Sequence, residues 1–323
     1  MIWLIWRQHR KQALFTLAAL AALAAIMVPT GLTMHAKYDS LGLGACRSTF
    51  GSASLMTQTE ATSRCESLSH QFQQDFGGMM LIAVLFVVLP VLVGVFFGAP
   101  LVAREVEQGT HRLVWTQGVS RLHWALAKFG LVGAITAVLA VGYALGVSWW
   151  FEPLVGASAG RLTYLSFDVQ GIVPVAYTLF ALALGVFAGT YWRKVLPAMG
   201  IALVGFAVVR VAIEVFARPR YLPAQNLTFA PGGSQTPNPA SGDWVMDLGV
   251  RNAAGELVLP NAQIGPCPPG GCLDTEAGPG ATNWLRYQPG DRFWLFQGIE
   301  TGIFVLLAAA LVFFALRRLR TIA

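Results

Sequence analysis

Four cysteines are the residues best suited to covalent or metal chemistry in this 323-residue chain. Two lie in the first quarter of the sequence, Cys46 and Cys65, and two lie near its end, Cys267 and Cys272. Even numbers of cysteines form disulfides or bind metal ions, but the segment around Cys267-x4-Cys272 has no paired histidine for zinc. We therefore predict no metal site and two disulfides, most simply Cys46–Cys65 and Cys267–Cys272, with pairing between the two groups still open.

Motifs for hydrolysis and for ATP binding are incomplete. Gly156-Ala-Ser158-Ala-Gly160 matches G-x-S-x-G, but the family order places the histidine after the serine, and all five histidines here precede Ser158. Neither an H-E-x-x-H metal motif nor a Gly-x4-Gly-Lys-[Ser/Thr] phosphate loop occurs. The sequence therefore predicts a chain that is not an enzyme and that holds no cofactor of its own.

The composition requires lipid as the solvent for much of the chain. Apolar residues make up 55% and charged residues only 12%, about half the charged share of soluble domains. A soluble globule of this size has too little interior to bury that much apolar surface. These proportions exclude a soluble enzyme, a disordered chain and a nucleic-acid-binding protein.

Six apolar stretches of 22 or 23 residues are long enough to cross a bilayer as helices. We predict an all-α polytopic membrane protein with transmembrane helices at residues 13–34, 79–101, 129–151, 171–192, 196–217 and 294–316.

The basic residues predict the orientation, because Lys and Arg near span ends stay on the cytoplasmic side. Segments 1–12, 102–128, 193–195 and 317–323 hold twelve basic residues in 49 positions, opposed only by Glu105 and Glu107. Both termini are therefore predicted in the cytoplasm, and the formal charge of +6 reflects topology. A cleaved signal peptide is the alternative for the first span, but its apolar run is long and Thr33-Met-His-Ala36 is no A-x-A site.

The remaining segments divide the chain into a membrane domain (1–217), an extracellular lobe (218–293) and a last span with its tail (294–323). Residues 35–78 form a large outside loop and 152–170 a short one, so all four cysteines lie on the oxidising side. The lobe is rich in turn residues, with strands expected at Trp244–Val250 and Glu256–Leu259. It has few apolar residues, so we expect it to pack on the spans or on a partner.

Two cytoplasmic segments are expected to contain helices. Residues 1–12 combine tryptophans with a basic block, which fits an interfacial helix before the chain turns into the first span, or only a basic flank. In 102–128 the second span should continue to about Gln108 and break at Gly109. Thr110 and Ser120 are candidate helix caps, and the short helix between them carries Leu113, Val114 and Trp115. Such an element could press on a cytoplasmic partner.

Three charges interrupt the last two spans. Arg210 is costly inside a membrane and needs a partner; Glu214, one turn along, is the nearest, and Glu300 of the last helix could also reach it. They could form part of a translocation path or a structural ion pair. Small-xxx-small pairs at Gly94/Gly98, Gly142/Gly146 and Gly185/Gly189 predict close helix packing within the bundle.

Several stretches together resemble one family. Gly98-Ala-Pro-Leu-Val-Ala-Arg-Glu105, Glu107-Gln-Gly-Thr110 and Trp115-Thr-Gln-Gly-Val-Ser-Arg121 resemble permease subunits of type-2 ATP-binding-cassette (ABC) exporters, especially compact actinobacterial forms. Trp6-Arg-Gln-His-Arg10, Tyr287-Gln-Pro-Gly-Asp-Arg-Phe-Trp294 and Ile299-Glu-Thr-Gly302 are similar too. The likeness covers all six spans and is loose in 218–293, where a longer lobe replaces the usual short re-entrant helices.

The resemblance implies an exporter in the bacterial plasma membrane, in contact with lipids. Two permease chains, identical or related, would form a dimer over cytoplasmic ATPase subunits that bind ATP and Mg. It also implies that the segment after the second span couples to the ATPase, with these candidates: Glu105, Glu107, Gly109, Thr110, His111, Arg112, Leu113 and Trp115. A solvated pair of glutamates is the alternative for the first two. The rival function is a membrane sensor or assembly factor whose lobe binds a ligand or partner.

Overall fold

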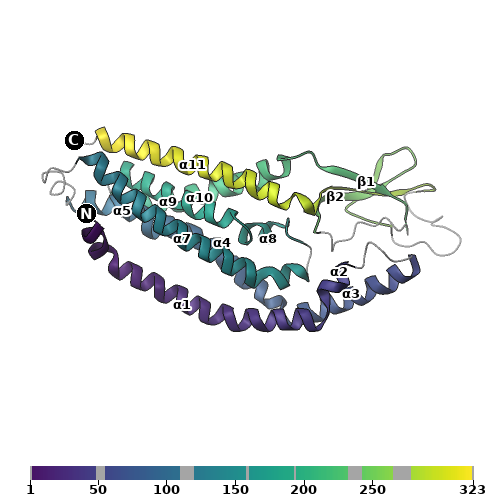
Figure 1. Cartoon of the computed structure of the whole chain (residues 1–323). Coiled ribbons are helices and arrows are strands. Elements are labelled where there is room, and N and C mark those ends of the chain that lie inside the picture. Colours follow the sequence, from purple (N-terminus) through teal and green to yellow (C-terminus); the bar gives the residue numbers. More distant parts are fainter. Residues whose placement is uncertain are drawn as a thin grey trace.

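The computed structural model of the protein describes residues 2–48, 55–109, 120–157, 160–192, 194–231, 242–264 and 278–321. Six of its helices are long and apolar enough to cross a membrane, which confirms the predicted all-α polytopic class. Both described ends of the chain lie at one end of the helix bundle, called here the terminal end, and a β-sheet lies at the other, called the lobe end (Figure 1). The spans are built on α1 (Ile2–Ser40), α4 (Met80–Val93) continued by α5 (Ala99–Glu107), α7 (Arg121–Gly156), α9 (Val173–Tyr191), α10 (Val195–Ala212) and α11 (Phe293–Thr321).

The first span differs from its prediction at both ends. Helix α1 is a single helix of 39 residues, so no break separates a helix over residues 1–12 from the span. At the lobe end α1 also runs past residue 34 to Ser40. Helix-forming residues on both flanks, Leu, Arg, Gln and Lys before the apolar run and Ala and Lys after it, let the helix continue beyond the run that the hydropathy pattern detects.

Residues 35–78, predicted as a loop, are largely helical. After α1 come α2 (Leu43–Ser48), α3 (Leu55–Phe76) and the 3-10 turn η2 (Gly77–Met79), which leads into α4. Phe72 of α3 is fully buried against Tyr38 of α1, and a disulfide joins Cys46 to Cys65 with a Cα–Cα distance of 5.9 Å. The pairing Cys46–Cys65 is thus confirmed, whereas Cys267 and Cys272 lie outside the described residues. The helix was missed because its apolar residues form one stripe rather than a continuous run.

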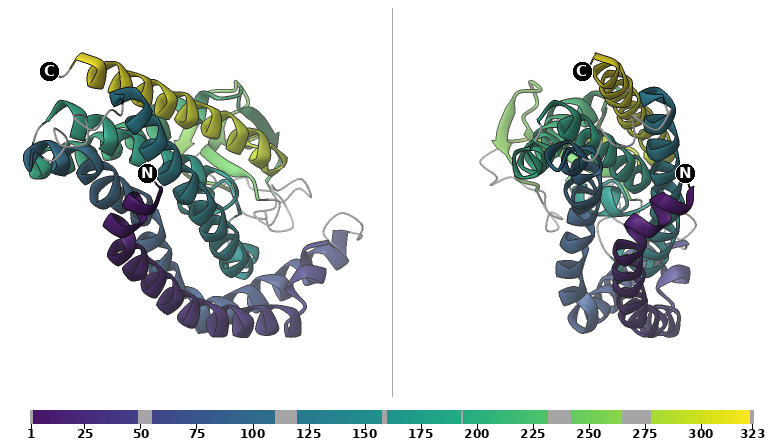
Figure 2. Two further views of the ribbon diagram at one scale, coloured as in Figure 1. Left: turned by 60° about the vertical axis from the view of Figure 1, so that its left-hand side comes forward. Right: turned by 90° about the vertical axis from the view of Figure 1, so that its left-hand side faces the viewer.

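Helix α9 is the centre of the bundle. Its apolar window is 83% buried, whereas the other five spans are 17–33% buried, and it packs against the second, third, fifth and sixth spans. In both views of Figure 2, α1 (purple) and α11 (yellow) lie on opposite sides of the teal helices. The second span reaches it through a π-helical turn, η3 (Gly94–Gly98). A Cβ atom on Gly98 would lie 2.6 Å from the Leu182 carbonyl oxygen, and one on Gly189 would lie 2.5 Å from that of Ala99. These glycines therefore allow the second and fourth spans to touch backbone to backbone, as predicted.

The pair Gly142/Gly146 on α7 does not pack within the bundle as predicted. A Cβ atom on Gly142 or Gly146 would meet no described atom within 4 Å, and both residues are exposed. These glycines lie on a face of α7 that no described part of the chain covers. The sequence pattern alone could not separate them from the other two pairs, because spacing on one helix does not say which neighbour the face meets.

The lobe contains a four-stranded antiparallel sheet with the strand order β1-β4-β2-β3. Strands β2 (Trp244–Arg251) and β3 (Leu257–Pro260) agree with the two expected strands, while β1 (Gln225–Phe229) and β4 (Thr282–Gln288) were not predicted because they are rich in polar residues. The sheet packs on the bundle through Trp244, whose ring meets the Tyr164 ring edge-on at 5.5 Å between centroids. The Asp243 carboxylate accepts a hydrogen bond from the Gly290 N–H just before α11.

Candidate functional site

A buried ion cluster lies at the lobe end of the bundle. It comprises Asp168 on the short helix α8 (Tyr164–Val169), Tyr177 on α9, Arg210 on α10, Arg218 on the 3-10 turn η5 (Arg218–Arg220) and Glu300 on α11. The exposed fractions of the four charged residues are between 1% and 6%. Burying ions is tolerable only when they are paired and hydrogen-bonded, and here two carboxylates meet two guanidinium groups.

Arg210 pairs with Asp168, not with the predicted Glu214 or Glu300. Its Nη2 atom lies 2.6 Å from the Asp168 Oδ2 atom, and its guanidinium group covers the Tyr177 ring at 4.4 Å from the centroid. Glu214 is one turn along the same helix but is only partly buried. The Arg210 side chain faces the bundle, so it meets the buried carboxylate of α8 instead of Glu214, which lies just after α10.

Glu300 pairs with Arg218, which the sequence reasoning did not consider. Arg218 donates from Nε to Glu300 Oε2 (2.9 Å) and from Nη2 to Glu300 Oε1 (2.8 Å), and its Nη2 also reaches Asp168 Oδ1 (2.7 Å). Tyr177 donates its hydroxyl to Glu300, and Tyr221 donates to the other Glu300 oxygen at 3.0 Å. Burial and the charge of Glu300 both raise the pKa of Tyr221, so its hydroxyl remains a donor.

A π-helical turn brings the two arginines to one side. Arg210 and Arg218 are eight residues apart, which in a regular α-helix would place them roughly 80° apart around the axis. Between them lies η4 (Ile213–Ala217), a π-helical turn that accommodates one extra residue. The angle between the two side chains around the helix axis is therefore close to that of residues seven apart in a regular α-helix, roughly 20°. The sequence contains both arginines, but the turn that aligns them carries no recognisable local pattern.

Gln297 fixes the helix ends that carry the cluster. Its Oε1 atom accepts the N–H groups of Ile172 (3.0 Å) and Val173 (2.9 Å), which begin α9, and its Nε2 atom donates to the Phe167 carbonyl oxygen of α8 (3.0 Å). The first N–H groups of a helix have no partner inside it. One fully buried side chain of α11 therefore holds α8 and α9 in place, and with them Asp168 and Tyr177.

The sequence reasoning missed Asp168, Tyr177, Arg218 and Tyr221, and treated residues 152–170 as a short loop. One signal was available: Arg210 and Arg218 are two arginines within eight positions at the end of an apolar helix, where a single Glu214 cannot neutralise both. The sequence could not show that α8 folds back under the lobe and supplies the second carboxylate.

At the terminal end, the two predicted glutamates bind other helices of the same chain. Glu105 Oε1 lies 2.6 Å from the Nζ atom of Lys128 on α7, whose ammonium group is buried and also donates to the Leu101 carbonyl oxygen (2.9 Å). The exposed Glu107 accepts the N–H of Val195, the first residue of α10, at 3.0 Å. Glu105, with 17% of its side chain exposed, is therefore not part of a solvated pair.

The break after α5 is where the sequence placed it. Helix α5 ends at Glu107, and Gly109 adopts φ = +69°, a left-handed conformation that favours glycine. At the other side of the segment, the Ser120 hydroxyl accepts the His123 N–H and caps α7. The remaining coupling candidates lie outside the described residues: Thr110, His111, Arg112, Leu113 and Trp115.

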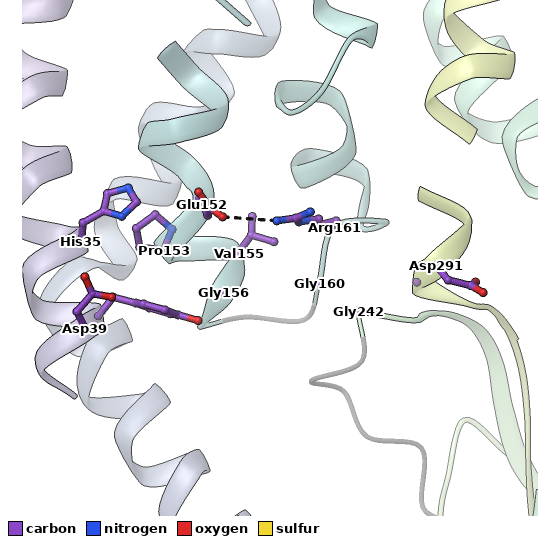
Figure 3. A pocket seen from close by; sticks show the side chains of 12 residues that line it. His35, Asp39, Glu152, Pro153, Val155, Gly156, Gly160, Arg161, Gly242 and Asp291 are labelled. Carbon is purple, nitrogen blue, oxygen red and sulfur yellow. Dashed lines mark ion pairs between the residues drawn. The ribbon is translucent and has the colours of Figure 1, made fainter. Parts of the chain in front are cut away.

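A polar cavity of about 610 Å³ opens at the lobe end between α1, the end of α7 and the base of the lobe. His35 and Asp39 line it from α1, Glu152 from α7, and Asp291 from the 3-10 turn η7 (Gly290–Arg292) that precedes α11 (Figure 3). Glu152 lies 3.7 Å from Arg161, and both side chains are at least half exposed. The cavity therefore offers a solvated space beside the lobe, with charges of both signs on its wall.

The family model described as ABC-2 membrane transporter related matches residues 17–218, from within α1 to Arg218 of the ion cluster. The matched part includes five of the six spans and the whole segment between α5 and α7. No significant match was found among curated proteins or solved structures. Because the match covers more than half of the chain, the protein belongs to the ABC-2 membrane transporter related family and is a multi-pass membrane protein of the ABC permease type.

Proposed function

We propose that this protein is the membrane-spanning subunit of an ATP-driven exporter in the bacterial plasma membrane. A separate cytoplasmic ATPase would drive it, and the substrate would move outward. In this arrangement the terminal end of the bundle faces the cytoplasm and the lobe end faces outward, as the distribution of Lys and Arg predicts.

The segment between α5 and α7 carries this proposal. It lies within the part of the chain that matches the ABC-2 family. The end of α5, just before this segment, is bonded to two other helices. Glu105 pairs with Lys128 of α7, and Glu107 accepts a hydrogen bond from the start of α10. A force applied to residues 108–120 would therefore reach three spans at once. This is the property that a coupling segment requires.

The energy source is assigned to another chain because these 323 residues contain no Gly-x4-Gly-Lys-[Ser/Thr] phosphate loop. A second permease chain, identical or related, would complete the transporter. The exposed face of α7 around Gly142 and Gly146 has the small residues that allow close helix contact, and membrane lipids would cover the remaining apolar surface. The polar cavity beside the lobe offers the substrate a solvated way out.

Purification from native membranes tests the proposal. A tagged full-length chain should co-purify with an ATPase subunit that carries a phosphate loop, and the complex should hydrolyse ATP. The chain stripped of that subunit should show no ATPase activity. Recovery of a histidine kinase or another regulator in place of the ATPase would instead support the sensor alternative.

A further inference from the structure

Helix α10 connects the two polar sites. The N–H of its first residue, Val195, donates to Glu107 at the terminal end, and Arg210 near its other end contacts Asp168 of the ion cluster. The span continues through η4 and η5 to Arg220, 26 residues in all, or about 39 Å at the rise of an α-helix. Arg218, the second arginine of the cluster, lies in this continuation.

The packing of α10 leaves it able to shift. Its buried residues are Ala198, Ala202, Phe206 and Arg210, each four positions after the last. They form one narrow stripe, and only 22% of the apolar window of the span is buried, against 83% for α9. The half of the stripe nearer the terminal end consists of alanines, which interlock little with a neighbouring helix. Small sliding movements of packed helices are a common way for proteins to change state.

We propose that Glu107 is a positioning residue that transfers movement of residues 108–120 to α10, and that α10 delivers this movement to the ion cluster. The Asp168, Arg210, Arg218 and Glu300 contacts would then differ between the two states of the transporter. This inference rests on the proposed function, because it needs an ATPase to move the segment.

The ion cluster is suited to receive such a movement. Asp168 pairs with both arginines: its Oδ2 atom lies 2.6 Å from Arg210 Nη2, and its Oδ1 atom accepts a hydrogen bond from Arg218 Nη2. Both arginines belong to the α10 span, while their carboxylate partners belong to α8 and α11. A shift of α10 therefore changes three ion pairs together, and charge pairs in a buried site have sharply distance-dependent energies. Arg218 also lies at the start of the lobe, so the lobe would move with it.

Glu107 is better placed than Glu105 to transmit movement to α10, because the two residues contact different partners. Glu105 holds α7 through the buried Lys128, a contact inside the bundle. Glu107 is exposed and touches α10 through one hydrogen bond to a helix N-terminus, where a carboxylate is favoured by the unpaired N–H groups and by the helix dipole. Such a contact fixes the start of α10 to the end of α5 without locking either helix into the core.

The test measures the distance between α8 and the far part of the α10 span in the full complex with its ATPase. Nitroxide-bearing unnatural amino acids at Ile172, just after α8, and at Val215, both exposed, leave the native cysteines unchanged. Double electron–electron resonance would compare the nucleotide-free complex with the complex bound to a non-hydrolysable ATP analogue. We expect the distance distribution to shift between these states in the wild-type complex.

Two substitutions remove the same hydrogen bond from opposite sides. Glu107→Ala removes the acceptor, and Val195→Pro removes the donor at a first helical position that tolerates proline; the extended backbone of Lys194 also suits a following proline. Both should abolish the nucleotide-dependent shift while the bound ATPase still hydrolyses ATP. Glu107→Gln, whose amide oxygen can still accept, and Gln108→Ala, an exposed neighbour, should retain the shift.

Other results would contradict either this inference or the proposed function. An unchanged shift in both Glu107→Ala and Val195→Pro would overturn the inference, as would equal distances in the two nucleotide states of a wild-type complex that transports. Recovery of the chain without any ATPase would contradict the proposed function instead. Should either variant misfold, as judged by its thermal unfolding, the other variant and the Glu107→Gln comparison decide the question.

Discussion

Arg218 and Glu300 form a bidentate ion pair between residues 82 positions apart, with N–O distances of 2.9 and 2.8 Å. The chain between them contains the entire β-sheet of the lobe. The pair therefore joins the two connections by which the lobe enters and leaves the bundle. Because both side chains are 1% exposed, neither ion could remain in place without the other at low cost.

Removal of one ion should reveal this dependence. Arg218→Ala leaves Asp168 and Glu300 buried with one cation fewer, so we expect a loss of about 3–5 kcal/mol in stability. Thermal unfolding in a fixed detergent measures it. Arg220→Ala, two residues on and exposed, is the matched control and should change stability by less than about 0.5 kcal/mol. Equal effects of the two substitutions would show that the ion cluster does not stabilise the fold.

The two kinds of glycine pair should respond differently to the same substitution. Gly185→Val should prevent folding or lower the yield of folded protein, because a Cβ atom there would lie 2.7 Å from the Ala99 nitrogen of the second span. Gly142→Val meets no described atom and should leave the monomer folded. Size-exclusion profiles of the solubilised variants compare them. A folded Gly185→Val protein with an unchanged profile would contradict the packing described for α9.

The disulfide between Cys46 and Cys65 should be detectable by thiol labelling. Maleimide should label neither cysteine before reduction and both afterwards, as read by mass spectrometry. Cys46→Ser should leave Cys65 reactive and destabilise the fold by about 2–4 kcal/mol. Labelling of Cys65 in the unreduced wild-type protein would exclude the bond. The same experiment tests the prediction that Cys267 pairs with Cys272.

The hydropathy pattern predicted all six spans, because runs of about twenty apolar residues have few alternatives to a transmembrane helix. The break at Gly109 and the cap at Ser120 were also predictable, since both depend on local backbone chemistry. The partner of Arg210 was not. It depends on the rotation of α10, on the π-helical turn after Ala212 and on the position of α8, and all three are set by packing against distant residues.

Gly109 offers a local test of the coupling segment. Its φ of +69° costs an L-residue roughly 1–2 kcal/mol, so Gly109→Ala should displace the start of the segment without disturbing the spans. We expect the complex to keep its ATPase subunit but to lose much of its coupled activity. Gly255→Ala, at φ = +82° in the lobe, is the matched control and should leave coupling unchanged. Loss of coupling in both variants would point to a general effect of strain.

ATP hydrolysis by the purified components distinguishes an ATP-driven permease from a membrane protein that no ATPase drives. The permease chain and its co-purifying subunit would be assayed separately and together in the same lipid vesicles. The proposal predicts no activity from the permease alone, and activity from the reconstituted pair that differs from that of the isolated ATPase and depends on residues 108–120. Hydrolysis that is the same with and without the permease, under conditions where the two proteins are shown to be bound, would contradict it.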